Sequence, residues 1–230
     1  STKVPWSRSR RTTSYLPECD SRMLIDGPAA PRARYLFAHG AGAPMDTPFM
    51  NAIAEGLSAN KIQVIRFEFA YMAKRRDDGK RRGPDRMPVL LEAWRTALDG
   101  LSSLDVPTLI GGKSMGGRAA ATYAAEPDGA SLIDGVICLG YPFHPPAKPE
   151  KTRLEPLRGA QRSTLIVQGE RDRFGTPEDV ISYALKPPVE VVWIPDGDHS
   201  FVPRKSSGLT ERENIDTAVH HVTAFIERMI

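Results

Sequence analysis

The sequence predicts an α/β fold in which a mostly parallel central sheet of about seven strands is flanked by helices on both faces. Short apolar runs alternate along the chain with longer segments whose apolar residues have helical spacing. Most of the short runs are apolar throughout, which is typical of parallel strands covered on both faces. The chain has 230 residues, of which 40% are hydrophobic, so it can bury one sizeable core.

This alternation assigns the elements in order along the chain. Residues 1–20 are expected to form a loose arm and residues 21–230 a single domain. Asp46 and Thr47 can cap the first helix. Residues 141–160 form a connection rich in proline and lysine without clear periodicity. The expected strands are 23–25, 34–38, 63–67, 108–111, 135–139, 164–168 and 189–194, and the expected helices are 48–57, 89–101, 115–125, 177–184 and 211–229.

The composition argues against several classes of function. Cys19 and Cys138 are too few for a disulfide framework, which favours a reducing compartment. No run approaches the roughly 20 apolar residues of a membrane span, and residues 1–11 lack the apolar core of a signal peptide. The formal net charge of +3 is mild, so neither nucleic acid nor a membrane is expected as a partner. We therefore expect a cytoplasmic protein that needs no cofactor and no metal.

A glycine-flanked serine is the strongest candidate for chemistry. Residues 108–118 read TLIGGKSMGGR, so an apolar strand leads into Ser114 and then into a helix. A serine in a strained strand-to-helix turn needs small neighbours two positions away, and Gly112 and Gly116 provide them. The same residues resemble the end of a phosphate-binding loop, but that motif needs a glycine where this chain has Pro107. We therefore interpret Ser114 as a nucleophile.

The turn after the second expected strand supplies a candidate oxyanion hole. The strand runs into His39, Gly40 and Ala41, followed by another glycine. Small residues allow the main chain to come within about 3 Å of a tetrahedral oxyanion. One N–H donor comes from the loop after this strand and the other from the residue after the nucleophile. Ala41 and Met115 are the candidates, and a plain glycine turn is the alternative interpretation.

Two later strand ends supply a candidate acid and a candidate base. Asp172 lies just past a late strand, where its carboxylate could orient a histidine, and Glu170 and Asp179 compete for this role. His199 follows the last expected strand in a turn-rich loop, where it could take the serine proton near neutral pH. His144 is the competing base. The order serine, aspartate, histidine along the chain favours Asp172 and His199.

These segments resemble the α/β-hydrolase superfamily over nearly the whole chain, from about residue 23 to residue 230. The chain looks most like the small lid-poor branch near the dienelactone hydrolases. That branch includes bacterial predicted hydrolases and the hydrolase-like domain of a subunit of the nonspecific-lethal histone acetyltransferase complex. The resemblance implies an α/β-hydrolase fold and the same triad, although dienelactone hydrolases use a cysteine in place of Ser114. The matching segments are HGAGAPMD at 39–46, RFEFAYM at 66–72, GGKSMGGR at 111–118, LGYPFHPP at 139–146 and DGDHSF at 196–201.

The predicted function is acyl transfer to water by a serine hydrolase that cleaves a small ester or related acyl compound. Tyr141, Phe143 and His144 follow the strand after the nucleophile and, with His39 and Gly40, are expected to line the substrate pocket. The short connection between the fifth and sixth expected strands leaves little material for a lid. This favours small, soluble acyl substrates.

A cationic stretch at residues 74–86 follows the third expected strand. With Lys113 and Arg118 it could attract an anionic substrate or an acidic partner, although such runs are usually solvated loops. Two other functions remain open. One is a protein-interaction module that keeps the hydrolase scaffold without turnover, and the other is an acyltransferase that uses the same triad.

Overall fold

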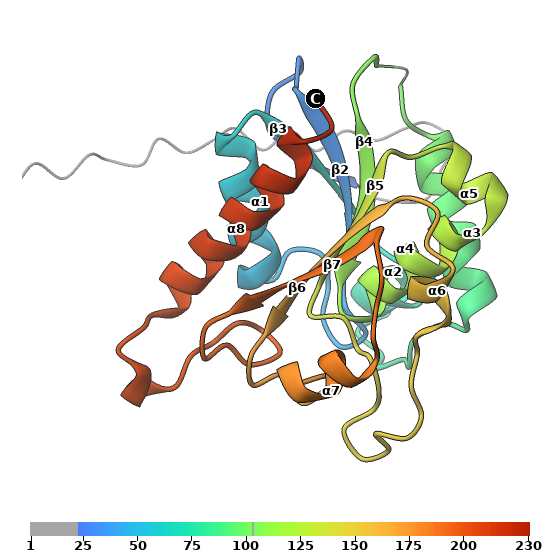
Figure 1. Ribbon diagram of the computed structural model, residues 1–230. Coiled ribbons are helices and arrows are strands. Elements are labelled where there is room, and N and C mark those ends of the chain that lie inside the picture. Colours follow the sequence, from blue (N-terminus) through green and yellow to red (C-terminus); the bar gives the residue numbers. More distant parts are fainter. Residues whose placement is uncertain (1–22, 103) are drawn as a thin grey trace, which may run out of the picture.

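The chain forms a seven-stranded sheet in the order β1-β3-β2-β4-β5-β6-β7 (Figure 1). The computed structural model describes residues 23–102 and 104–230, so the expected arm at 1–20 and Cys19 lie outside the described residues. Edge strand β1 is antiparallel to β3, and every other neighbouring pair is parallel. The strands are β1 Met23–Asp26, β2 Ala33–Ala38, β3 Ile62–Phe67, β4 Thr108–Lys113, β5 Gly135–Leu139, β6 Ser163–Gly169 and β7 Val189–Ile194. The predicted fold class is confirmed.

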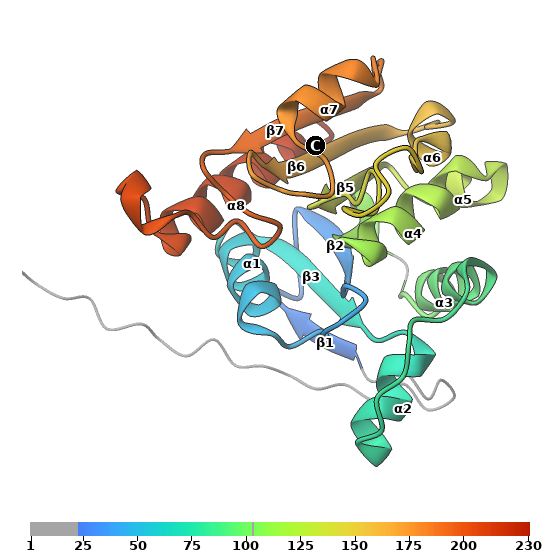
Figure 2. The same cartoon turned by 90° about the horizontal axis from the view of Figure 1, so that it is seen from below.

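Strands β2 and β4 lie side by side where the strand order reverses. From β2 the chain moves outward to β3, and from β3 it returns past β2 to β4. Open α/β sheets bind ligands at such a point, beyond the carboxyl ends of the strands. His39 follows β2 and Ser114 follows β4, so both lie at this edge of the sheet, from which Figure 2 views the molecule.

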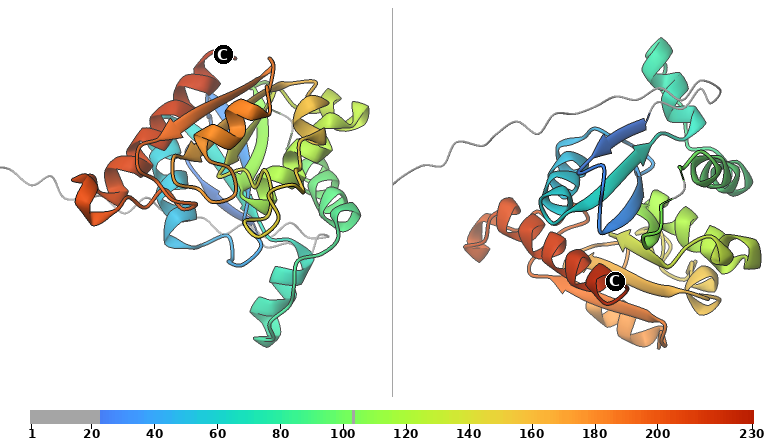
Figure 3. Two further views of the ribbon diagram at one scale, coloured as in Figure 1. Left: turned by 60° about the horizontal axis from the view of Figure 1, so that its bottom comes forward. Right: turned by 90° about the horizontal axis from the view of Figure 1, so that it is seen from above.

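Helices cover both faces of the sheet. Helices α1 and α8 pack together on one face, and α3, α4, α5 and α6 lie on the other, while α2 projects away from the sheet (Figures 1, 2 and 3). Among the described residues, no helix is both long enough and apolar enough to span a membrane. The helices are α1 Pro48–Ala59, α2 Ala70–Asp78, α3 Met87–Asp99, α4 Met115–Ala125, α5 Pro127–Ser131, α6 Glu155–Arg158, α7 Pro177–Ser182 and α8 Glu211–Glu227.

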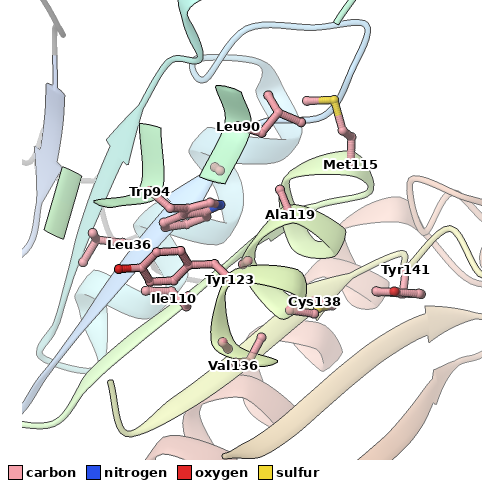
Figure 4. Packing of buried hydrophobic residues seen from close by; sticks show 14 of the residues in the cluster. Leu36, Leu90, Trp94, Ile110, Met115, Ala119, Tyr123, Val136, Cys138 and Tyr141 are labelled. Atoms are coloured by element: carbon pink, nitrogen blue, oxygen red, sulfur yellow. The ribbon is translucent and has the colours of Figure 1, made fainter. Parts of the chain in front are cut away.

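Successive side chains of β2 enter two separate hydrophobic cores. Tyr35 and Phe37 pack on the side of α1 and α8, whereas Leu36 packs on the side of α3 and α4. In the second core, Trp94 of α3 and Tyr123 of α4 lie over the strand residues (Figure 4). All six residues of β2 are buried, and its last four residues, YLFA, form the continuous apolar run that is typical of a covered strand.

Several element boundaries agree with the sequence-based expectations. Strands β5 and β7 and helix α4 have the expected bounds. The Thr47 hydroxyl accepts a hydrogen bond from the Met50 N–H at 3.3 Å, as expected of a helix cap. Asp46 instead forms an ion pair with Arg76 at 2.9 Å. The acid that was expected to help cap α1 therefore fixes the loop between β2 and α1 to α2.

The interpretation of residues 74–86 as a loop is wrong in part, because residues 74–78 belong to α2. Only Tyr71 and Met72 of this helix are buried, and it ends at Gly79, where φ is 70°. A helix with so few buried residues has little apolar periodicity to detect. For the same reason the short helix α6 was missed within the connection at 141–160.

Candidate active site

Ser114 occupies the turn between β4 and α4 in a strained conformation, with φ of 51° and ψ of −113°. Such a backbone costs a non-glycine residue on the order of 1–3 kcal/mol, and it persists only where the surroundings enforce it. A Cβ atom on Gly112 would lie 2.5 Å from the Ala38 carbonyl oxygen, and one on Gly116 would lie 2.6 Å from the His39 carbonyl oxygen. The prediction that both flanking positions need small residues is confirmed, and at these distances even a Cβ atom does not fit. The tight turn brings the serine to the carboxyl edge of the sheet.

His199 lies between Ser114 and Asp172. Its Nε2 is 3.0 Å from the Ser114 Oγ, and its Nδ1 is 2.7 Å from the Asp172 Oδ2. An ionised carboxylate only accepts hydrogen bonds, so Nδ1 carries a proton and donates a hydrogen bond to Asp172. Nε2 can then accept the proton of the Ser114 hydroxyl. The three side chains come from turns after β4, β6 and β7 and meet at one edge of the sheet.

Asp172 is fully buried and held by three donors. Its Oδ1 accepts a hydrogen bond from the Phe174 N–H at 2.9 Å. Its Oδ2 accepts from the Gln168 side-chain amide at 2.9 Å and from His199 Nδ1. These contacts fix the carboxylate in the orientation that holds the imidazole toward Ser114.

The competing acids and the competing base are engaged elsewhere. Glu170 accepts a hydrogen bond from the Asp196 N–H at 2.8 Å. Asp179 and Thr176 form the capping box of α7. His144 is buried, and its Nε2 lies 3.4 Å from an Asp179 oxygen, so this histidine ties the loop after β5 to α7. None of these side chains has a hydrogen bond to Ser114 among the described residues.

Lys113 supports the loop that carries the histidine, contrary to the expectation that it would join the cationic group facing an anionic substrate. Its Nζ donates a hydrogen bond to the His199 carbonyl oxygen. The ammonium also lies 5.4 Å from the centre of the Phe49 ring and 6.0 Å from that of Phe201. Burial lowers the pKa of Lys113 to about 8. We therefore assign this lysine to the placement of His199.

The candidate oxyanion donors lie next to the nucleophile. A Cβ atom on Gly40 would lie 3.7 Å from the Ser114 Cβ, so the turn after β2 passes directly beside the serine. Met115 is the first residue of α4, where a helix has unpaired N–H groups and a positive end. Within the described part of the chain, neither the Ala41 N–H nor the Met115 N–H has a hydrogen-bond acceptor. Two unpaired donors therefore lie in segments that adjoin the reactive hydroxyl.

The residues expected to line the substrate pocket are mostly buried, which differs from the prediction. His39, Tyr141 and Phe143 have no exposed surface, and only Gly40 is partly exposed. Tyr141 donates its hydroxyl to the Arg153 carbonyl oxygen at 2.8 Å. Sequence position placed these residues correctly at strand ends, but whether an aromatic side chain points outward or inward depends on packing.

Two residues that contact the candidate acid and base were not predicted from the sequence. Gln168 follows the apolar residues 165–167 of β6 and donates to Asp172, and a polar residue at the end of a buried run could have indicated such a role. Phe174 packs on His199, with 4.5 Å between the ring centres and an angle of 37°. It is half-buried beside the imidazole, so it forms one wall of the site.

A serine in a strained strand-to-helix turn, contacted by a histidine that an aspartate orients, is the arrangement of an α/β-hydrolase. A family model described as "Alpha/beta hydrolase domain" matches residues 31–227, and the chain belongs to this family. Membership in the family supports a hydrolase.

Solved structures with low sequence identity have the same fold. Est1E from Butyrivibrio proteoclasticus matches with a TM-score of 0.69 and 14% identity over 95% of this chain and 99% of that chain. A dienelactone hydrolase from Anabaena variabilis has a TM-score of 0.68 and 18% identity over 95% and 97%. A serine hydrolase without lid from Xanthomonas campestris has a TM-score of 0.67 and 17% identity over 96% and 95%. Neighbours of dienelactone-hydrolase type thus agree with the resemblance noted in the sequence.

Proposed function

We propose that the protein is a serine hydrolase that cleaves a small ester or related acyl compound through Ser114, His199 and Asp172. The observation that carries the proposal is the continuous chain of contacts from the Ser114 Oγ through both imidazole nitrogens to the Asp172 carboxylate. The strained turn at Ser114 supports it independently, because strain of this kind is retained where function requires it.

The reaction follows from these contacts. The Ser114 Oγ attacks the substrate carbonyl carbon while His199 Nε2 takes the hydroxyl proton, and the carbonyl π electrons move onto the oxygen. The N–H groups of Ala41 and Met115 stabilise this oxyanion. When the tetrahedral intermediate collapses, the leaving group departs with the proton from His199. Water then attacks the acyl-enzyme by the same route in reverse, which releases the acid and restores Ser114.

The substrate is proposed to be small. Among the described residues, the connection between β5 and β6 contains only the four-residue helix α6. Acyl transfer to an acceptor other than water would use the same groups. An interaction module without turnover, suggested by the resemblance to the nonspecific-lethal complex subunit, would have no need for an aligned base or for strain at Ser114.

Covalent labelling tests the proposed function. A fluorophosphonate probe is expected to label the native chain at Ser114, because the probe needs an activated serine and an oxyanion hole. His199→Ala is expected to slow labelling by about 10³-fold or more, since the base is lost. His144→Ala should change the rate by less than about fivefold, because its ring contacts Asp179 instead of the serine. Mass spectrometry of intact protein measures all three rates.

The outcomes separate the hypotheses. A folded native chain that takes up no probe would contradict the hydrolase and favour the interaction module. Loss of labelling in His144→Ala but not in His199→Ala would show that the base is His144.

We further propose that the substrate carries a negative charge. In the cationic stretch, Arg76 pairs with Glu68 and Arg82 pairs with Asp78. Arg75 is different: its Nη1 donates to the Gly42 carbonyl oxygen at 3.3 Å, one residue beyond Ala41. Its partly exposed positive charge therefore lies beside the proposed oxyanion hole.

Arg75→Gln is expected to lower kcat/KM for a monoanionic ester about tenfold, which corresponds to one unit charge acting over several ångströms in a mixed dielectric. A neutral ester of equal size should lose less than about twofold. Arg81→Gln removes the same charge from an exposed position in the same stretch and serves as the control. Equal losses for the two esters in Arg75→Gln would reject the charge preference.

A further inference from the structure

The turn at residues 40–42 is held from one side by three side-chain donors. The His39 Nδ1 is 2.7 Å from the Gly40 carbonyl oxygen. The Tyr71 hydroxyl is 3.3 Å from that same oxygen and 3.0 Å from the Ala41 carbonyl oxygen. Arg75 binds the third carbonyl, that of Gly42. All three carbonyl groups of the turn are therefore occupied.

The carbonyl groups determine where the N–H groups of the turn point. In a planar trans peptide, the C=O of one residue and the N–H of the next point in opposite directions. Because the Gly40 carbonyl is held by His39 and Tyr71, the Ala41 N–H must point away from these two side chains. The α-carbon of Gly40 faces Lys113 and Ser114, which lie 3.6 and 3.7 Å from a Cβ placed on it.

We propose that Tyr71 is a positioning residue for the oxyanion hole: its hydroxyl fixes the peptide units on both sides of Ala41 so that the Ala41 N–H is available to the oxyanion. The inference rests on the proposed function and adds a residue from α2 to it. His39 assists through its protonated Nδ1, since its Nε2 accepts the Phe69 N–H at 3.1 Å.

Tyr71 is itself held firmly. It is 3% exposed, and its backbone N–H donates to the Asp85 carboxylate at 3.1 Å. Its ring packs against His39, with 5.8 Å between the ring centres and an angle of 62°. Burial raises the pKa of Tyr71 well above the usual value, so the hydroxyl keeps its proton and remains a donor. A rigid donor of this kind can fix a glycine-rich turn that has few restraints of its own.

Tyr71→Phe tests the proposal, because it removes only the hydroxyl. Complete loss of an oxyanion donor typically costs about 10²–10³-fold in rate. His39 remains in the variant, so we expect kcat to fall about 10–100-fold, with KM changed less than about threefold. Inhibition by a trifluoromethyl ketone, whose adduct with serine places an oxyanion in the hole, should weaken by a similar factor.

Tyr35→Phe is the matched control. The Tyr35 hydroxyl donates to the Ile137 carbonyl oxygen at 3.0 Å, so this variant also loses one buried hydrogen bond from tyrosine to the backbone. Both variants are expected to lose similar thermal stability, whereas only Tyr71→Phe should lose kcat and affinity for the ketone.

Three results would decide the matter. A kcat in Tyr71→Phe within about twofold of the native value would overturn the inference, provided that the native chain is labelled by fluorophosphonate. Equal loss of kcat in both variants would also overturn it, because the effect would then be one of stability. If the native chain is not labelled, the proposed function fails, and the inference fails with it.

Discussion

Ser114→Ala is expected to lower kcat by more than about 10⁴-fold and to abolish labelling by fluorophosphonate, while the protein remains folded. The hydroxyl lies 3.0 Å from the His199 Nε2, and alanine offers no atom that can form an acyl-enzyme. Alanine and serine have similar backbone restrictions at positive φ, so the strain of the turn is retained and the melting temperature should change little. Hydrolysis of a chromogenic acetate ester, normalised to folded protein by circular dichroism, measures the loss.

Ser131→Ala provides the comparison for this variant. Ser131 is exposed at the end of α5, and its hydroxyl donates to the Asp128 carbonyl oxygen at 2.7 Å. This change should leave activity intact. Residual activity above about 1% in folded Ser114→Ala would show that another group performs the attack, and the proposed mechanism would be wrong.

Asp172→Asn should reduce kcat by about 10³–10⁴-fold, although the asparagine side chain has nearly the same shape as the aspartate side chain. The carboxylate accepts three hydrogen bonds with two oxygens, from the Phe174 N–H, from Gln168 and from His199. An asparagine has one carboxamide oxygen, and its NH₂ group would face a donor in either orientation. If the NH₂ group faces His199, the imidazole proton must move to Nε2, where it blocks acceptance of the serine proton. Steady-state kcat, measured over a range of pH, is the readout.

Asp179→Asn separates a catalytic from a structural carboxylate. This residue caps α7, so we expect a loss of about 1 kcal/mol in stability and nearly native kcat. A larger loss of kcat in Asp179→Asn than in Asp172→Asn would reverse the assignment of the acid.

The positions of the candidate triad were predictable because they depend on chain order and strand ends. Most of the expected strands were apolar runs, and parallel strands bring their carboxyl ends to the same edge of the sheet. Gly112 and Gly116 were predictable for a similar reason, since a local turn determines which neighbours fit. In these cases a short segment of sequence is enough to identify the strand end or the turn. The parallel sheet then brings these segments together in one site.

The side-chain network around the triad could not be predicted in this way. Lys113 turns toward the His199 carbonyl instead of toward solvent, and Tyr71 reaches the oxyanion turn from a helix that was not expected. These contacts join segments far apart in the sequence, and their geometry depends on how helices pack. His39 was expected to touch substrate, yet it is fully buried and contacts Gly40 and Phe69 instead. The position of a residue at a strand end predicts that it lies near the site. The direction of its side chain depends on tertiary packing.

The position of β7 at the end of the sheet has a consequence for the lifetime of the active state. Among the described residues this strand pairs only with β6. His199 lies in the loop that follows it, whereas Ser114 follows the interior strand β4. Edge segments open locally at a lower free energy than the strands of the interior. A molecule in which β7 has separated would keep β2 to β5 paired and still lack its general base. On heating, activity should therefore be lost before the whole protein unfolds. The loss should occur over the same temperature range as the increase in hydrogen exchange of the β7 amides.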